Sequence, residues 1–324
     1  MTSTKILLTG GTGFLGSHVA EMLCERGSAV RATVRTTSDT RWLDPLQLEL
    51  VEADLADPPG LAEALEGVSA VVHVGGLTRA TDAAAYDRVN VAGTAALAVA
   101  AGAAGVERFV YVSSLAARGP DGMPGPVSDY GRSKHGGEAR LAELAAAGKA
   151  PPSIRVLRPA GIYGPRDTDL LTLFQMAARG FLVLPSSQGR LQPVHVRDVA
   201  SAVLRALDSA DSVDPGPLPV AGSEVVGWAE VAEVLRAGFE RTVRVVRLPA
   251  VMFTLAGAAA ELGARLTGKP PVFDRRRATD LTQVTWTCDI EATKRTLGWE
   301  PEVDLHTGMV ETAAWYAEQG WLSR

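Results

Sequence analysis

Tyr130 and Lys134 have the residue types and the spacing of a proton-transfer pair. They lie four residues apart in SDYGRSK, so in a helix they share one face, with Lys134 one turn beyond the phenol. A nearby ammonium stabilises phenolate and lowers the phenol pKa from its usual value of about 10, which makes tyrosine a workable proton donor and acceptor near neutral pH. The same spacing also arises where a tyrosine anchors a helix and a lysine extends into solvent. Its meaning therefore depends on the elements around it.

Ser113 and Ser114 are well placed to join this pair. An apolar run predicts a strand from Arg108 to Ser113, and 15 residues separate Ser114 from Tyr130. In open α/β sheets the ligand crevice forms at the carboxyl ends of the strands. A serine hydroxyl at that edge can hydrogen-bond to a carbonyl and polarise it. Together these side chains predict proton transfer at a carbonyl or an alcohol.

The first residues of the chain predict a nucleotide site. KILLTGGTGFLG, from Lys5 to Gly16, runs from a short apolar strand through four glycines into a predicted helix that ends at Arg26. Without Cβ atoms the backbone lets a phosphate approach, and the free N–H groups and dipole of a helix N-terminus favour negative charge. A dinucleotide pyrophosphate fits this description. A glycine-rich surface turn is the alternative.

The end of the second predicted strand, Ala29 to Val34, bears on which dinucleotide binds. This position normally meets the adenosine ribose, where an acidic residue hydrogen-bonds the 2′-hydroxyl. The sequence instead has Arg35 there, with Arg31 before it and the hydroxyls of residues 36–38 after it. A guanidinium and hydroxyls suit a 2′-phosphate, so we predict NADP(H), with NAD(H) as the second choice. The alternative is a solvated arginine at a strand end.

The order of the remaining segments predicts the fold class. Apolar runs of strand length at residues 48–52, 70–74 and 108–113 alternate with helical patterns, including one long predicted helix at 83–104. Unbroken apolar runs are typical of parallel strands that are covered on both faces. We therefore predict an α/β protein with a doubly wound parallel sheet, the Rossmann fold. His73, in one of these strands, has no partner at metal-ligand spacing and is expected to be a packing or hydrogen-bonded residue.

The C-terminal half is expected to form a smaller, discontinuous substrate lobe. We place the dinucleotide-binding domain at residues 1–163 and 191–222, and the lobe mainly at 164–190 and 223–324. Apolar aromatic residues of the lobe suit a substrate with little charge, although such residues are commonly core. They include Phe174, Phe181, Phe253 and Phe273.

Composition limits the partners. The 324 residues are 46% hydrophobic and 21% charged, and the net charge of −5 comes from interspersed residues, so no basic face for nucleic acid is expected. Cys24 and Cys288 lie far apart and in no Cys/His cluster, which predicts buried thiols and no metal site. The apolar runs are too short for a signal peptide or a membrane span. We expect a cytoplasmic protein with a small-molecule substrate and no membrane partner.

Seven motifs follow one another along most of the chain. They are TGGTGFLG (9–16), Asp54, NVAGT (90–94), YVSS (111–114), YGRSK (130–134), LRPAGIYGPRD (157–167) and PVHVRDVA (193–200). In this order they resemble the extended branch of the short-chain dehydrogenase/reductase superfamily, nearest its dihydroflavonol reductase and 3β-hydroxysteroid dehydrogenase-like group. The resemblance implies a Rossmann fold, an NAD(P) cofactor and a homodimer formed through the helices near Asn90 and Tyr130.

The resemblance also implies roles for individual residues. The family's catalytic serine falls on Ser114, with Ser113 as the neighbouring alternative, and its tyrosine and lysine fall on Tyr130 and Lys134, which also contact the cofactor. Its helix asparagine, which supports a proton relay to the lysine, falls on Asn90. The remaining cofactor-binding positions fall on Gly10, Gly13, Phe14, Leu15, Gly16, Arg35, Asp54, Leu55, Val74, Pro159 and Ile162.

Two features of the sequence guide the choice of reaction. Sugar dehydratases follow the catalytic threonine with an Asp-Glu pair, whereas Leu115 and Ala116 follow Ser114 here, so dehydration is disfavoured. Pro193 stands where many sugar enzymes carry an arginine for the diphosphate. We therefore predict an NADP(H)-dependent oxidoreductase that interconverts a ketone or aldehyde and an alcohol on a small, largely apolar substrate. The alternatives are an NAD-dependent nucleotide-sugar 4-epimerase and a non-catalytic nucleotide-sensing protein.

Overall fold

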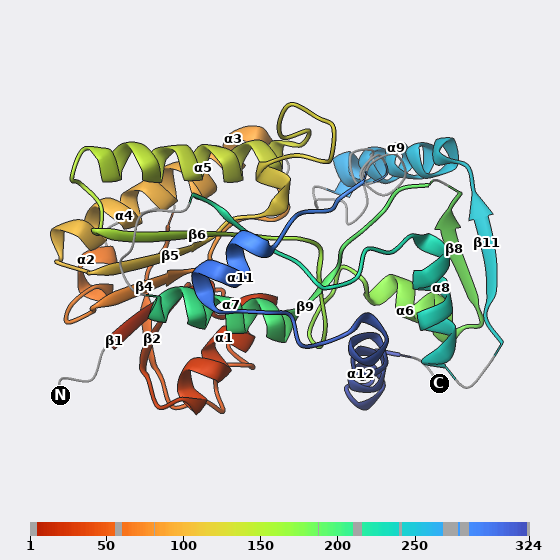
Figure 1. The fold of residues 1–324 in the computed structure, drawn as a ribbon, viewed down its shortest axis with the longest axis horizontal. Coiled ribbons are helices and arrows are strands. Elements are labelled where there is room, and N and C mark those ends of the chain that lie inside the picture. Colours follow the sequence, from red (N-terminus) through yellow and green to blue (C-terminus); the bar gives the residue numbers. More distant parts are fainter. Residues whose placement is uncertain are drawn as a thin grey trace.

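A seven-stranded parallel sheet forms the centre of the larger part of the molecule (Figure 1). The computed structural model describes residues 5–55, 60–80, 82–186, 188–209, 216–239, 242–267, 278 and 285–322. The strand order is β10-β6-β5-β4-β1-β2-β3, which is a doubly wound Rossmann arrangement, as predicted. The strands are β1 (Lys5–Thr9), β2 (Ala29–Val34), β3 (Glu49–Glu52), β4 (Ala70–His73), β5 (Arg108–Val112), β6 (Ser153–Pro159) and β10 (Leu218–Val220).

Helices cover both faces of this sheet, which explains why the central strands β1 and β4 are mostly apolar and buried. In β1, Ile6 and Leu8 point into one core, whereas Leu7 between them points into the core on the opposite face. The first core is closed by α1 (Phe14–Glu25) and α7 (Val196–Asp208), and α11 (Glu291–Leu297) also packs there. The second is closed by α2 (Leu61–Ala64), α4 (Thr94–Ala103) and α5 (Asp129–Ala146), at the top left of Figure 1.

The helix predicted over residues 83–104 is not continuous. It consists of α3 (Ala83–Tyr86), a π-helical segment η2 (Asp87–Gly93) and then α4. Gly93, at the end of η2, approaches the chain so closely that a Cβ there would lie 2.7 Å from the carbonyl oxygen of Leu55. Such π-helical turns interrupt helices at functional sites, and this one carries Asn90.

A smaller lobe packs beside the carboxyl ends of the sheet strands. It has its own core, in which Phe174 and Tyr316 meet edge to face with centroids 5.0 Å apart. Its strand β8 was missed in the segment 164–190, because it pairs with a strand about sixty residues later. The elements are α6 (Leu171–Ala178), β8 (Phe181–Pro185), α8 (Trp228–Ala237), β11 (Arg244–Leu248), α9 (Ala250–Thr267) and α12 (Leu305–Glu318). The domain boundaries given above remain a prediction.

Two short segments join the sheet to the lobe. β7 (Ile162–Tyr163) leaves β6 and pairs in parallel with β9 (Val194–His195), which leads into α7. Among the described residues, no helix is both long and apolar enough to cross a membrane. Cys24 and Cys288 are free and half-buried rather than buried. Because β7 and β9 follow β6 and precede α7, the chain crosses between the two parts of the molecule at the carboxyl edge of the sheet, where the predicted site residues lie.

Candidate active site

The predicted site residues meet along the carboxyl edge of the sheet. Because neighbouring strands are parallel, the ends of β1, β2, β4, β5 and β6 lie at one edge. The glycine turn follows β1, Arg35 follows β2, Val74 follows β4, Ser114 follows β5, and Pro159 ends β6. Strand topology alone therefore brings together residues up to 149 positions apart in the sequence.

The glycine turn forms a close-packed cradle that fits a dinucleotide phosphate. Gly10 has φ +73°, and a Cβ there would lie 2.6 Å from the backbone nitrogen of Gly75, which follows β4. A Cβ on Gly16 would lie 2.0 Å from the carbonyl oxygen of Gly10. Gly13 is the exposed N-cap of α1, and no side chain caps this helix. The backbone N–H groups of its first turn, which include those of Phe14 and Leu15, are therefore left for an anion.

The resemblance also implies that Asp54 and Leu55 form the adenine pocket and that Val74 contacts the cofactor, and these residues lie next to this cradle. Val74 donates its backbone N–H to the carbonyl oxygen of Thr9 at 3.2 Å, which fixes the loop after β4 beside β1. Leu55 reaches the same place, because its Cδ1 atom lies 3.0 Å from where a Cβ on Gly75 would sit. Asp54 directly precedes it and is half-buried. Their roles toward the adenine remain predictions.

The two arginines of β2 and its end have different environments. Arg35 is exposed just after the strand, and its backbone N–H donates to Ser38 Oγ at 2.9 Å. Arg31 is buried, and its guanidinium donates to the carbonyl oxygens at the end of α2, including that of Ala64 at 2.9 Å. It also pairs with Glu49 at 2.9 Å. Arg31 is therefore not available to a 2′-phosphate, because it is buried and its two terminal nitrogens bond inside the protein, whereas Arg35 is exposed.

Tyr130 and Lys134 lie in the first two turns of α5, as predicted. Ser128 caps this helix by accepting the backbone N–H of Gly131 at 3.0 Å. Burial raises the pKa of Tyr130, and a hydrogen bond with Ser114 acts in the opposite direction. The sequence predicted a lowered phenol pKa instead. The difference arises because burial disfavours phenolate and because the Lys134 ammonium is directed elsewhere, donating to the carbonyl oxygen of Val112 at 2.9 Å.

Lys134 is a buried cation. It is 4% exposed, and burial lowers its pKa to about 8, while Glu138 one turn further along α5 acts to raise it. Its Nζ atom lies 4.8 Å from the centre of the Tyr111 ring. On its other side is Gly76, where a Cβ would lie 3.4 Å from that Nζ. Near neutral pH the lysine is therefore charged but close to its titration range.

The structure separates the roles of Ser113 and Ser114. Ser113 is buried, and its hydroxyl donates to Glu138. Arg158, on β6, donates to the same carboxylate through Nε at 2.9 Å and through Nη2. Ser114 instead lines the cavity described below, where its hydroxyl accepts the N–H of Ala116 at 3.2 Å. Ser114 is thus the serine that can meet a substrate.

Glu138 and Arg158 were not singled out from the sequence. Glu138 lies four residues beyond Lys134 on the same face of α5, and this spacing is the one signal that could have identified it. Arg158 lies on a different element, so its pairing with Glu138 is a property of the fold.

Asn90 is fixed by three hydrogen bonds in the π-helical segment. Its Oδ1 accepts the N–H of Leu77 at 2.8 Å, and its Nδ2 donates to the Leu77 carbonyl and to Ser133 Oγ, both at 2.9 Å. Ser133 Oγ in turn donates to the carbonyl oxygen of Tyr130. Asn90 therefore joins the loop after β4 to the first turn of α5, close to the lysine. Its part in a proton relay remains a prediction.

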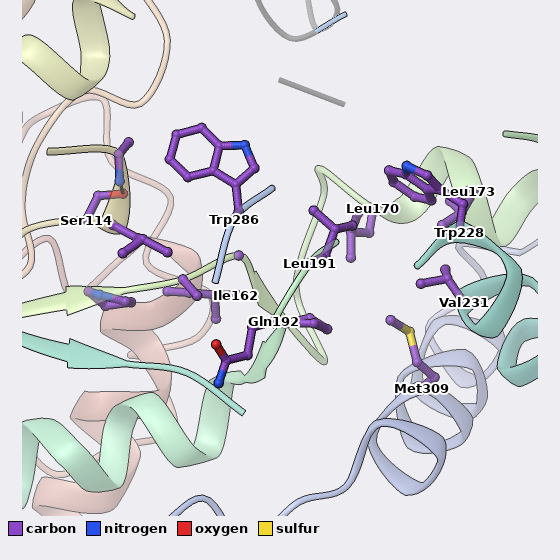
Figure 2. Close-up of a pocket in the computed structure, with 16 residues that line it drawn as sticks. Ser114, Ile162, Leu170, Leu173, Leu191, Gln192, Trp228, Val231, Trp286 and Met309 are labelled. Carbon is purple, nitrogen blue, oxygen red and sulfur yellow. Dashed lines mark hydrogen bonds between the residues drawn. The ribbon is translucent and has the colours of Figure 1, made fainter. Parts of the chain in front are cut away.

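A cavity of about 300 Å³ opens from Ser114 toward the smaller lobe (Figure 2). None of the 16 residues that line it is an Asp, Glu, Lys or Arg. Gln192 uses its amide internally, donating to Gly222 O and accepting from Cys288 N at 2.9 Å each. The lining residues are Ser114, Leu115, Ala116, Pro159, Ala160, Gly161, Ile162, Leu170, Leu173, Leu191, Gln192, Pro193, Trp228, Val231, Trp286 and Met309.

The cavity includes some of the residues that the sequence analysis named and leaves out others. Pro159, Ile162 and Pro193 all line it. The aromatic residues expected to favour an apolar substrate do not: Phe174 is core and Phe181 is exposed on β8. These two phenylalanines therefore do not contribute to substrate preference, and the sequence did not show this because a lobe core and a cavity wall are both apolar. Phe253 is on α9 and does not line the cavity either, and Phe273 lies outside the described residues.

His73 is a structural residue, as expected. Its Nδ1 lies 2.6 Å from Thr9 Oγ1 and its Nε2 lies 2.9 Å from Thr94 Oγ1, with its ring stacked on Tyr111. The described part of the chain contains no group of three His, Cys, Asp or Glu residues that could hold a metal ion. The polar groups brought together at this edge are the Ser114 hydroxyl, the Tyr130 phenol and the Lys134 ammonium, beside the glycine cradle.

Comparisons with known proteins agree with this geometry. The model of the NAD dependent epimerase/dehydratase family matches residues 6–221. Ceramide reductase of Caulobacter vibrioides is 34% identical, with 98% of this chain and 96% of the relative covered. UDP-glucose 4-epimerase of Vibrio cholerae is 28% identical, with 95% and 94% covered. The structure of MoeE5 in complex with UDP-glucuronic acid and NAD is 25% identical and superposes with a TM-score of 0.76 over 97% of this chain and 99% of that one. The chain therefore belongs to the NAD dependent epimerase/dehydratase family and is an NAD(P)-dependent enzyme of the extended short-chain dehydrogenase/reductase type.

Proposed function

We propose that this enzyme is an NADP(H)-dependent oxidoreductase that interconverts a carbonyl and an alcohol on a largely apolar substrate. The observation that carries the proposal is the cavity, which begins at the hydroxyl of Ser114 and continues between apolar walls into the smaller lobe. A polar reacting end would lie at Ser114 and an apolar body would extend past Leu173 toward Met309 (Figure 2). The reductase relative, whose name includes a lipid, supports this interpretation.

The protein groups would act on the carbonyl oxygen. A bound nicotinamide supplies the hydride in the reducing direction. Ser114 donates a hydrogen bond to the carbonyl oxygen, and Tyr130 gives it the phenolic proton as charge develops there. The raised pKa of Tyr130 keeps the phenol protonated at neutral pH, as a proton donor requires. Lys134 would hold the nicotinamide ribose, and the hydrogen bond with Ser114 is the interaction that favours proton loss from the phenol.

The preference for NADP(H) rests on Arg35. Its exposed guanidinium follows β2, where the adenosine ribose is expected, and of the two arginines considered there it alone is left for a 2′-phosphate. We expect Arg35→Ala to weaken NADPH binding about tenfold or more, since charge-assisted bonds to phosphate are strong, and to leave NADH binding nearly unchanged. Arg41→Ala is the matched control, because Arg41 is also exposed nearby but pairs with Asp39.

A 4-epimerase acting on a nucleotide sugar is the second candidate, favoured by the 28% identity with UDP-glucose 4-epimerase. A nucleotide sugar carries a diphosphate, which proteins bind with arginine, lysine or helix N-termini. The described residues that line the cavity include neither arginine nor lysine, and Pro193 stands where an arginine was expected for such a substrate. These features rank the reductase above the epimerase, and the presence of Ser114, Tyr130 and Lys134 together ranks it above the non-catalytic alternative.

The experiment that tests the proposal combines cofactor and substrate. The purified protein is incubated with NADPH or NADH and with ketones of increasing alkyl length, and consumption of the reduced nucleotide is measured by absorbance. We expect NADPH-dependent reduction that improves with chain length. Tightly retained NAD together with interconversion of UDP-sugars would show the epimerase instead, and nucleotide binding without either reaction would favour the non-catalytic alternative.

A further inference from the structure

Helix α9 has an apolar face that faces solvent. The helix follows β11 and runs along the upper edge of the smaller lobe in Figure 1. Val251 is 59% exposed, Met252 47%, Leu255 60% and Leu262 62%. We call these four residues the α9 face. None of them belongs to the three apolar cores of the described chain.

The spacing of these residues makes them one continuous strip. Val251, Leu255 and Leu262 are separated by four and seven residues, which places them along one side of a helix. Exposed alanines at positions 256 and 259 lie on the same side, so no charged side chain with described placement interrupts it. Single exposed apolar residues are ordinary, but a continuous apolar strip on a surface helix indicates an interaction site.

The charge of the sequence that precedes and follows this helix indicates the kind of partner. In the sequence, residues 241–278 carry eight Lys or Arg and two Asp or Glu, a net charge of +6 in a chain whose overall net charge is −5. Two of these arginines, Arg244 and Arg247, are exposed on β11 directly before α9. An apolar helix strip with basic flanks is the pattern by which helices lie in the interface of an anionic bilayer.

We propose that α9 docks on an anionic lipid surface, with the α9 face inserted among the acyl chains and the neighbouring arginines against the headgroups. This differs from the expectation of no membrane partner, which considered only segments that span a bilayer. A helix lying in the interface needs no spanning length. The contact suits the apolar substrate proposed above but does not depend on it.

Vesicle flotation with the full-length protein tests the proposal without nucleotide or turnover, so its failure is distinct from failure of the proposed function. The probes are vesicles of phosphatidylcholine alone and of phosphatidylcholine mixed with phosphatidylglycerol. We expect binding to the mixed vesicles, weaker binding to the neutral ones, and a loss of about tenfold or more in Leu255→Gln/Leu262→Gln. The matched control is Leu50→Gln/Met123→Gln, which changes two exposed apolar residues elsewhere and should bind as wild type.

Three results would overturn the proposal. They are absence of binding to the mixed vesicles, equal binding to neutral vesicles, and unchanged binding of the α9 double variant. Light scattering on the same proteins measures their oligomeric state and so tests whether a second copy of the chain covers the α9 face. A wild-type dimer that the α9 variant converts to monomer, while the control variant stays dimeric, would assign the α9 face to self-association and refute the lipid contact.

Discussion

Replacing Glu138 by Gln should change how the site responds to pH without touching any group that contacts substrate. Glu138 lies one helical turn beyond Lys134 and raises the lysine pKa, opposing the burial that lowers it to about 8. Removing the negative charge should therefore lower the pKa of Lys134 further. The charged form of the lysine is lost as pH rises through its pKa, so the variant should lose function at a lower pH than wild type.

The size of this shift follows from the geometry of the helix. Residues four apart have Cβ atoms about 6 Å apart, and at an effective dielectric of about 20 two unit charges at that separation interact by about 3 kcal/mol, or about two pKa units. Arg158 bonds to the same carboxylate and partly neutralises it. We therefore expect a downward shift of about one to two units in the pKa of Lys134.

The assay is the pH dependence of kcat/KM and of NADPH affinity. Glu143→Gln is the matched control, because Glu143 is also on α5 but is 61% exposed and pairs with Arg140 at the surface. The alkaline limb of the pH profile should shift to lower pH in Glu138→Gln and should not shift in the control. Circular dichroism and urea unfolding check that the variant is folded, because a glutamine at position 138 accepts hydrogen bonds from Arg158 more weakly than the carboxylate does. An alkaline limb that coincides with that of wild type in a folded variant would refute the electrostatic role of Glu138.

Three further outcomes follow from the same structure. Gly16→Ala should weaken nucleotide binding by at least about a hundredfold, because its Cβ would lie 2.0 Å from a carbonyl oxygen. Gly125→Ala is the control and should bind as wild type, because a Cβ there meets open space. Equal nucleotide affinities of the two variants, measured by calorimetry, would contradict this. Burial lowers the pKa of His18 to about 4 and that of His73 to about 3, so the folded state binds fewer protons than the unfolded state. The free energy of unfolding should therefore fall below pH 6.5, by up to about 1.4 kcal/mol per pH unit for each histidine. Urea midpoints that do not change between pH 7 and pH 5 would exclude this contribution. Leu173→Trp should fill the cavity and raise KM for long ketones more than for short ones, and a uniform change would argue against the cavity as the substrate site.

Local features of the sequence were enough to predict most of the nucleotide half. Three successive residues of β1, Ile6 to Leu8, are apolar and buried because helices cover both faces, and that run is visible without a structure. Gly10 and Gly16 were identifiable because a close backbone approach leaves glycine as the residue that fits. Tyr130 and Lys134 were found because helical spacing places them on one face and because they follow the glycine turn and the strand-end serine in the chain.

The features that were missed depend on contacts between distant elements. Arg31 was associated with a phosphate because its type suits one, but tertiary contacts at the end of α2 occupy its donors. Glu138 and Arg158 meet only because α5 packs on β6, and no local pattern records that contact. Similarly, Phe174 could not be distinguished from a cavity residue, since side chains in a lobe core and along a cavity wall are equally apolar.

The most direct test of the proposed reaction is a comparison of Tyr130→Phe with wild type in single-turnover reduction of a long-chain ketone by NADPH. If Tyr130 donates the proton, the rate should fall by a factor of about a hundred or more while NADPH affinity stays nearly intact, because the ring remains and the hydroxyl alone is lost. An unchanged rate would remove Tyr130 from the mechanism. It would also contradict the assignment of Ser114, Tyr130 and Lys134 as the reacting centre.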